Sequence, residues 1–280
     1  RLLLRWSGFH IEEPAIAAMM KLMRARNVEQ ADRALQRFRL PCFNFVFADR
    51  HGDIGYRQVG LVPRRKSGQP GLLNPAIDGQ NWRGFLTAAQ MPALLRPQRG
   101  LIVTANNRPV PLRYPHFLGH AFSSPDRATR IEVLLRQQSR VSIEQIKKVQ
   151  LDVQLPDARV LLPHMLALVA RERLSKVQKR LVDRLRQWDY QAHGGSIETT
   201  VFVSWYRQMQ AALQAHPAMI RRLGEPQRAS ARRLRALFAV ADERSFLPKL
   251  LEQALDKAIA KLREDLGADA RKWHWSRYHK

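Results

Sequence analysis

Two consecutive amide side chains, at Asn106 and Asn107, follow a short apolar run near the middle of the chain. The run, residues 101–105, reads Leu-Ile-Val-Thr-Ala and predicts a short buried strand, after which Pro109 holds Arg108 in an extended conformation. Amides at the end of a strand offer neutral hydrogen-bond donors, and binding sites are often built at such positions. A polar turn is the simpler interpretation, because Asn and Pro are common turn formers. The residues alone do not decide between the two.

The other residues able to do chemistry are not arranged as a metal or nucleotide site. His116 and His120 are four residues apart, but Pro115 and Gly119 argue against a helix there, and no HExxH motif is present. Cys42, the single cysteine, excludes an internal disulfide and a cysteine-based zinc site. The sequence has no GxGxxG, Walker A or GxSxG motif. We therefore predict no bound metal and no cofactor from these patterns.

The charge balance makes nucleic-acid binding a hypothesis to weigh. The chain carries 48 Lys and Arg against 24 Asp and Glu, a net charge of +24. However, the arginines are interleaved with Asp, Glu and Gln, and no aromatic-basic platform is visible, so a solvated basic surface explains the excess equally simply. A basic, helix-rich module that binds nucleic acid or an anionic surface remains the alternative. A membrane span is excluded, because Pro163 and His164 interrupt the longest apolar stretch.

The chain has two regions with different sequence patterns, which meet near Pro125. These regions must position the residues able to do chemistry. In residues 1–124, closely spaced Pro and Gly separate short apolar runs, which predicts strands and loops. The clearest pattern is a hairpin, in which residues 43–48 turn through residues 49–53 into residues 54–60. Two helices are expected before it, over residues 13–24 and, capped by Asn27, to about Phe38.

Residues 125–280 show helical periodicity as far as about Leu266. Ser142 and Gln145 are spaced as a capping box at the start of one of these helices. An apolar stripe at helical spacing indicates core packing rather than a cofactor site, and it comprises Val201, Phe202, Trp205, Met209 and Leu213. The Arg-rich residues 219–236 are consistent with a basic surface, which would include Arg221, Arg222, Arg232 and Arg233.

A set of short motifs, spread over nearly the whole chain, has a recognisable order and spacing. They are Leu4-Arg5-Trp6, Phe45-Val46-Phe47-Ala48-Asp49, Gly52-Asp53-Ile54-Gly55-Tyr56, Gly60-Leu61-Val62-Pro63-Arg64-Arg65, Asp78-Gly79, Trp82-Arg83-Gly84, Thr104-Ala105-Asn106-Asn107-Arg108-Pro109, Asp126-Arg127-Ala128-Thr129-Arg130-Ile131 and Trp188-Asp189. Together they resemble the β chain of the penicillin acylase family, which includes penicillin, cephalosporin and N-acyl-homoserine-lactone acylases. The hairpin and the Asn-Asn-x-Pro turn are the most specific of these motifs.

The resemblance implies an α+β fold, in which this segment forms part of the αββα sandwich of the N-terminal-nucleophile hydrolases and is followed by a mostly helical region. It also implies amide hydrolysis through an acyl-enzyme on a serine freed by autoproteolysis. The α-amino group of that serine acts as the base, and its ordinary pKa of about 7.7–8.0 suits the task. The serine precedes this segment in the family, and the internal Ser7 does not replace it. We therefore expect an interior fragment, incomplete at both ends and inactive by itself.

Two catalytic positions are implied by the same resemblance. Asn106 matches the asparagine of the family's oxyanion hole, where a rigidly held amide that never titrates stabilises the tetrahedral intermediate. Arg127 matches an active-site arginine that supports the asparagine and the terminus of the nucleophile electrostatically. A salt bridge from Arg127 to Asp126 or another neighbour is the alternative interpretation.

The resemblance also sets expectations about partners and location. The partners would be a small N-acyl amide substrate, of β-lactam or acyl-homoserine-lactone type, and the rest of the processed precursor, namely its α chain and the N-terminal part of its β chain. Some family members bind a structural calcium, but the matching aspartate falls at about His116, so no metal ligand is assigned. No specific nucleic acid is expected, and the expected location is the periplasm.

Overall fold

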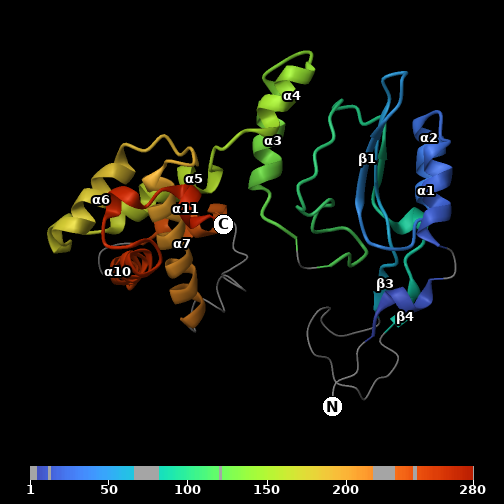
Figure 1. Ribbon diagram of the computed structural model, residues 1–280. Coiled ribbons are helices and arrows are strands. Elements are labelled where there is room, and N and C mark those ends of the chain that lie inside the picture. Colours follow the sequence, from blue (N-terminus) through green and yellow to red (C-terminus); the bar gives the residue numbers. More distant parts are fainter. Residues whose placement is uncertain are drawn as a thin grey trace. The chain divides into compact units, whose positions relative to one another are not determined.

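The structure is a computed structural model that describes residues 5–11, 14–65, 82–119, 122–216, 231–241 and 245–279, without the side chains of residues 231–233. The chain forms two compact units, Arg1–Ser123 and Ser124–Lys280. Helices and antiparallel sheets occur together, as the predicted α+β class requires (Figure 1). Leu4, Glu13 and Asp78-Gly79, which entered the sequence predictions, lie outside the described residues.

The first unit is built on the predicted hairpin. β1 (Asn44–Ala48) and β2 (Ile54–Gln58) pair antiparallel, with Asn44 opposite Gln58 and Ala48 opposite Ile54, which confirms that prediction. β5 (Ala93–Leu95) pairs with the other edge of β2, so the sheet order is β1-β2-β5. β3 (Pro63–Arg65) and β4 (Trp82–Phe85) form a separate two-stranded sheet.

The turn of the hairpin is held by the carboxylate of Asp49. Its Oδ1 accepts hydrogen bonds from the backbone nitrogens of His51 at 2.9 Å and Asp53 at 3.1 Å. Its Oδ2 accepts from the backbone nitrogen of Val28, at 3.2 Å. These bonds hold the pKa of Asp49 below its ordinary value against the opposing effect of desolvation. One aspartate therefore closes the turn and joins it to Val28, which precedes the hairpin in sequence.

Two helices lie against this sheet, and Figure 1 shows them side by side next to β1. They are α1 (Ala15–Met23) and α2 (Val28–Leu35). Asn27 caps α2 as predicted, because its Oδ1 accepts from the backbone nitrogen of Gln30 at 2.9 Å. α2 ends before Phe38, because the backbone nitrogen of Phe38 bonds to the carbonyl of Leu35 in a tighter, 3₁₀-type turn.

A buried ion pair fastens α2 to β2. Arg57 Nε lies 2.5 Å from Asp32 Oδ1, and Arg57 Nη2 lies 2.9 Å from Asp32 Oδ2, a bidentate arrangement. The two side chains are 8% and 9% exposed. The remaining bonds are also made: Arg57 Nη1 donates to the carbonyl of Ala88, and Gln36 Nε2 donates to Asp32 Oδ2. The pair thus connects α2, β2 and the 3₁₀ helix η2 (Ala88–Gln90).

The predicted strand at residues 101–105 is wrong. These residues form no ladder with any described strand, because β5 occupies the edge of β2. The backbone nitrogen of Ala105 instead donates to Asn107 Oδ1 at 3.0 Å. An apolar run becomes a strand only where a neighbouring backbone offers hydrogen bonds, and here a side chain takes that place.

The second unit is helical. Its helices are α3 (Asp126–Arg136), α4 (Ile143–Gln150), α5 (Pro156–Leu168), α6 (Lys176–Arg186), α7 (Ile197–Ala215), α9 (Ala231–Ala239), α10 (Leu247–Leu266) and α11 (Trp275–Tyr278), with 3₁₀ helices η3 (Arg171–Arg173) and η5 (Ala270–Lys272). The capping box of Ser142 and Gln145 begins α4 as predicted. None of the helices in the described part of the chain has the length and apolarity needed to cross a membrane.

The predicted apolar stripe forms the centre of this second unit. All five of its residues are buried, and α7, which carries them, packs against α10. Trp205 is fully buried, and its indole nitrogen donates to the carbonyl of Leu251 on α10 at 2.9 Å. The stripe is therefore core, as its spacing indicated. The predicted basic surface is not described by the structure. Arg221 and Arg222 lie outside the described residues, and the side chains of Arg232 and Arg233 are not described.

The buried ion pair leads to a stability prediction. Asp32→Ala leaves the Arg57 guanidinium buried without its counter-charge, which should cost about 3–5 kcal/mol. Asp53→Ala is the matched control, because Asp53 forms a half-exposed pair with Arg96. Native-state hydrogen exchange of the α2 amides in the full-length protein measures both changes. Equal loss of protection in the two variants would contradict the structural importance of the buried pair.

Candidate functional site

Asn106 lies in a loop of the first unit, and its backbone has an unusual conformation. Its φ is +63°, in the left-handed region that Asn and Gly tolerate better than other residues. The side chain is exposed, whereas the preceding Ala105 is buried. The carbonyl of Asn106 accepts a hydrogen bond from the backbone nitrogen of Ser123 at 2.8 Å. The backbone of the residue is thus held by Ser123 at an exposed position.

Asn107 has a different function in the same loop. Its Oδ1 accepts from the backbone nitrogen of Ala105, and its Nδ2 donates to the carbonyl of Arg108 at 3.3 Å. Asn107 also forms an isolated bridge with Ser123, and the guanidinium of Arg108 lies 5.1 Å from the centre of the Phe122 ring. The second amide therefore shapes the loop, which leaves the first as the better candidate for binding. The polar-turn interpretation fits Asn107, and the binding-site interpretation of Asn106 stays a prediction.

Arg127 belongs to the second unit, where it is the second residue of α3 and is exposed. Asn106 and Arg127 are therefore in different units, and the chain passes from one unit to the other between Ser123 and Ser124. The N-cap position of α3 is Pro125, which provides no side-chain capping bond. Asp126 is the acidic residue of the first turn, where a negative charge is favourable at the positive end of the helix dipole.

A second carboxyl group, which the sequence analysis missed, lies beside Asp126. Asp157, in the first turn of α5, is within hydrogen-bonding reach of the Asp126 side chain, and α3 packs on α5. Burial, followed by the hydrogen bond and charge of Asp126, raises the pKa of Asp157 to about 7. No sequence motif links these two residues, because only the packing of two helices brings them together.

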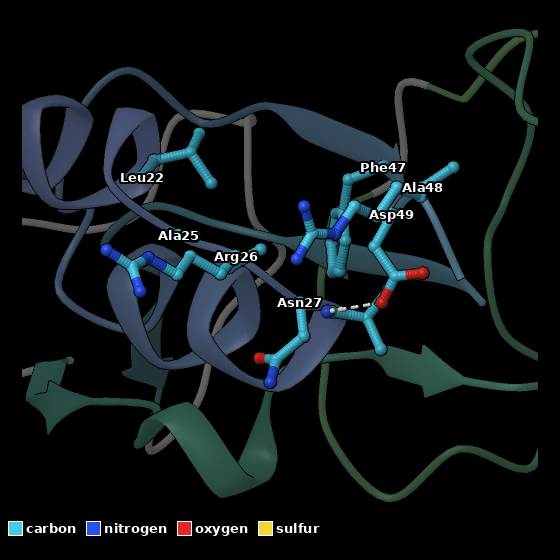
Figure 2. A pocket seen from close by; sticks show the side chains of 10 residues that line it. Leu22, Ala25, Arg26, Asn27, Phe47, Ala48 and Asp49 are labelled. Atoms are coloured by element: carbon cyan, nitrogen blue, oxygen red, sulfur yellow. Dashed lines mark hydrogen bonds between the residues drawn. The ribbon is translucent and has the colours of Figure 1, made fainter. Parts of the chain in front are cut away.

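A pocket of about 560 Å³ lies elsewhere in the first unit, and Figure 2 shows its lining. It is formed by the end of α1, the connection to α2 and the end of β1. Asn27 caps α2, and Asp49 is occupied by three backbone nitrogens, one of which is marked by the dashed line in Figure 2. The other lining residues are apolar or arginine, so this pocket has no general base or nucleophile among its described side chains.

The position expected for a calcium-ligating aspartate does not suit that ion. His116 stands there, and its ring packs edge-on against Tyr114, with 5.8 Å between the ring centres. Calcium prefers oxygen ligands, which imidazole does not provide. In the described residues no group of three or more His, Cys, Asp or Glu is gathered closely enough to hold a metal ion. His116 therefore does not replace the expected aspartate as an oxygen ligand.

Comparisons with known proteins connect this geometry to one family. The family model described as penicillin amidase matches residues 1–280. Penicillin G acylase of Escherichia coli is 30% identical over 189 residues, covering 66% of this chain and 22% of that protein. The acyl-homoserine lactone acylase QuiP of Pseudomonas aeruginosa is 38% identical over 114 residues, covering 40% of this chain and 13% of that protein. The chain thus spans less than a quarter of either relative.

A solved structure supports the fold over almost the whole chain. The thermostable penicillin G acylase from Alcaligenes faecalis superposes with a TM-score of 0.68 at 21% identity, covering 96% of this chain and 54% of that one. This similarity confirms the predicted α+β class and shows that the chain shares the fold of that penicillin G acylase.

The left-handed backbone at Asn106 leads to a prediction about which substitution removes the amide cleanly. Asn106→Ala should weaken the loop by about 1 kcal/mol relative to Asn106→Gly, because a Cβ is unfavourable at positive φ and Gly is not strained there. Hydrogen exchange of the peptide around residues 104–110 in the full-length protein measures the difference. Equal protection in the two variants would show that the left-handed conformation does not constrain this position.

Proposed function

Because the chain belongs to the penicillin amidase family, we propose that it is part of an acylase that hydrolyses the amide bond of an N-acylated substrate. The single observation that carries the proposal is the exposed amide of Asn106, held in a left-handed turn by its own backbone and by the bonds of Asn107. The names of the relatives, a penicillin G acylase and acyl-homoserine lactone acylases, support substrates of β-lactam or acyl-homoserine-lactone type.

Asn106 stabilises the negative charge that develops during the reaction. The N-terminal serine of the mature β chain, which is not in this segment, attacks the amide carbon, while its own α-amino group accepts the proton. The carbonyl oxygen becomes an oxyanion, to which the Nδ2 hydrogen of Asn106 donates. Since an amide carries no titratable charge and the loop is already ordered, no reorganisation is needed as the charge forms.

Arg127 contributes a fixed positive charge. A guanidinium is protonated at every working pH, so it favours the neutral form of a nearby α-amino group and stabilises a nearby oxyanion. Its position in the first turn of α3 ties it to a packed helix rather than to a loop. The family resemblance supports this role for Arg127, namely keeping the α-amino group basic and supporting the asparagine of the oxyanion hole.

The partners of this segment are the rest of its own precursor and a small N-acyl amide. The precursor supplies the α chain and the N-terminal part of the β chain, and autoproteolysis frees the serine. The name of one relative, the penicillin acylase 2 proenzyme of Pseudomonas sp., 28% identical over 231 residues, supports this processing. The location is the periplasm, on the basis of the family resemblance. No observation favours the nucleic-acid alternative, whose only basis is the net charge of +24.

The assignment of Asn106 is tested in the full-length processed protein. Asn106→Gly should lower kcat by about 10²–10³, because that is the usual effect of removing one oxyanion donor. Steady-state release of free amine from penicillin G and from an N-acyl-homoserine lactone measures it. Asn107→Gly is the control for loss of loop order, because it removes the side-chain hydrogen bonds within the loop and leaves Asn106 in place. A loss below threefold in Asn106→Gly would remove this residue from the active site.

Arg127 is tested against an arginine of the same helix. Arg127→Lys keeps the charge but loses the planar guanidinium, so we expect unchanged folding and a large loss of kcat. Arg136→Lys is the matched control, because Arg136 is exposed at the other end of α3 and pairs with Glu132. Steady-state kinetics and thermal melts compare the two variants. Equal activity would show that Arg127 is one more solvated cation.

A further inference from the structure

The first turns of α3 and α5 meet at the two carboxyl groups of Asp126 and Asp157. α3 packs on α5, and the Asp157 side chain is within hydrogen-bonding reach of that of Asp126. Ser124 Oγ donates a hydrogen bond to Asp126 Oδ2. The Oδ1 atom of Asp157 is buried and has no hydrogen-bond partner. The two groups thus differ: Asp126 has a hydroxyl donor, whereas part of Asp157 has none.

Two carboxyl groups within hydrogen-bonding reach of each other cannot both be ionised without strong repulsion, so one proton lies between them. The proton belongs on Asp157, because a buried oxygen without a donor is a poor place for negative charge. Asp126 is the better carboxylate, since it accepts from Ser124 and lies in the first turn of α3, where the helix dipole favours an anion. The carboxylic acid of Asp157 then donates a hydrogen bond, which the carboxylate of Asp126 accepts.

This bond links the first turn of α3 to the first turn of α5. The N-cap position of α3 is Pro125, which makes no side-chain capping bond. In this turn the backbone nitrogen of Thr129 bonds to the carbonyl of Pro125, and the Asp126 side chain is held by Ser124 and Asp157. Arg127 is the next residue along this turn. Movement of the turn would displace the Arg127 backbone directly.

We infer that Asp157 is a positioning residue, whose neutral carboxylic acid donates a hydrogen bond to the Asp126 carboxylate and so fixes the first turn of α3 and, with it, Arg127. The effect of the α3 position on catalysis rests on the function proposed for Arg127. The effect of Asp157 on the first turn of α3 does not rest on it, and this effect is measurable without any substrate.

The groups around the pair are consistent with one shared proton. On α3, Arg130 is committed to Asp152, with Nη2 2.7 Å from Oδ1 and Nε 2.9 Å from Oδ2. On α7, burial and the charges of the two aspartates raise the pKa of Tyr206, so this phenol stays neutral. The charge of Asp126 adds to burial in raising the pKa of Asp157.

The pH dependence follows from the direction of the shift. The pKa of Asp157 is raised from 3.8 to about 7 in the folded protein. The contribution of Asp157 to stability is therefore fully present below pH about 4, where Asp157 is protonated in both the folded and the unfolded protein. This contribution is lost as the pH rises through about 7. Above that pH both carboxyls are charged and repel each other, so the first turn of α3 loosens.

The experiment is hydrogen exchange of the full-length processed protein, comparing variants at equal pH. At pH 6, Asp157→Ala should speed exchange in the first turn of α3 about tenfold, since a hydrogen bond to a charged acceptor is lost, while α4 is unchanged. Asp157→Asn should keep wild-type protection at pH 6 and exceed it at pH 8.5, because its amide donates at every pH. Asp183→Asn, which removes an exposed pair with Arg171, is the control and should match wild type in α3 at both pH values.

Kinetics then test the link to Arg127. The ratio of kcat for Asp157→Asn to that of wild type should rise above pH 7, and Asp157→Ala should add nothing to the loss caused by Arg127→Lys. Wild-type exchange of α3 in Asp157→Ala, or an Asp157→Asn variant that follows the wild-type pH profile, would overturn the pair. Altered exchange with an unchanged kcat would overturn the positioning role. Absence of turnover in wild type would instead be the failure of the proposed function, and the exchange data would still decide whether Asp157 fixes α3.

Discussion

The buried pair of Asp32 and Arg57 is the constraint on which the first unit depends. Taking two charges out of water is costly, and the cost is offset only when both ions keep their partners in good geometry. Here the pair is bidentate, and its remaining bonds go to Gln36 and to the carbonyl of Ala88. Helix α2 and strand β2 therefore have one relative position at which the charges are satisfied. Because β1 and β5 both pair with β2, the position of β2 relative to α2 also sets the position of these two strands.

The loop that carries Asn106 is ordered by a similar principle with neutral groups. The backbone of residues 101–105 finds no strand partner, and Asn107 supplies an acceptor from its side chain. The backbone is left-handed at Asn106, and the amide of Asn107 is used within the loop. Two adjacent residues of the same type thus differ in their surroundings, because the backbone of this loop takes its hydrogen bond from the side chain of Asn107.

The second unit combines a conventional core with an unusual helix start. Trp205 and the apolar stripe of α7 pack against α10 and make a rigid base of helices. α3 packs against α5, which itself contacts α10, and Asp126 of α3 lies beside Asp157 of α5. Such a pair is stable only with a proton between its members, so the arrangement is sensitive to pH where a salt bridge would not be. That sensitivity lies one residue away from Arg127.

The sequence by itself determined the features that depend on neighbours along the chain. The hairpin follows from alternation and a turn formed around Asp49, the helix starts follow from Asn27 and Ser142, and the α7 stripe follows from its spacing; the motif order indicated the family that the comparisons show. Tertiary structure alone decided the rest. Residues 101–105 read as a strand but lack a partner backbone, and the pairings of Asp32 with Arg57 and of Asp126 with Asp157 join residues far apart in sequence. Local patterns record propensity and burial, whereas hydrogen bonds and shared protons depend on which distant groups the packing brings together.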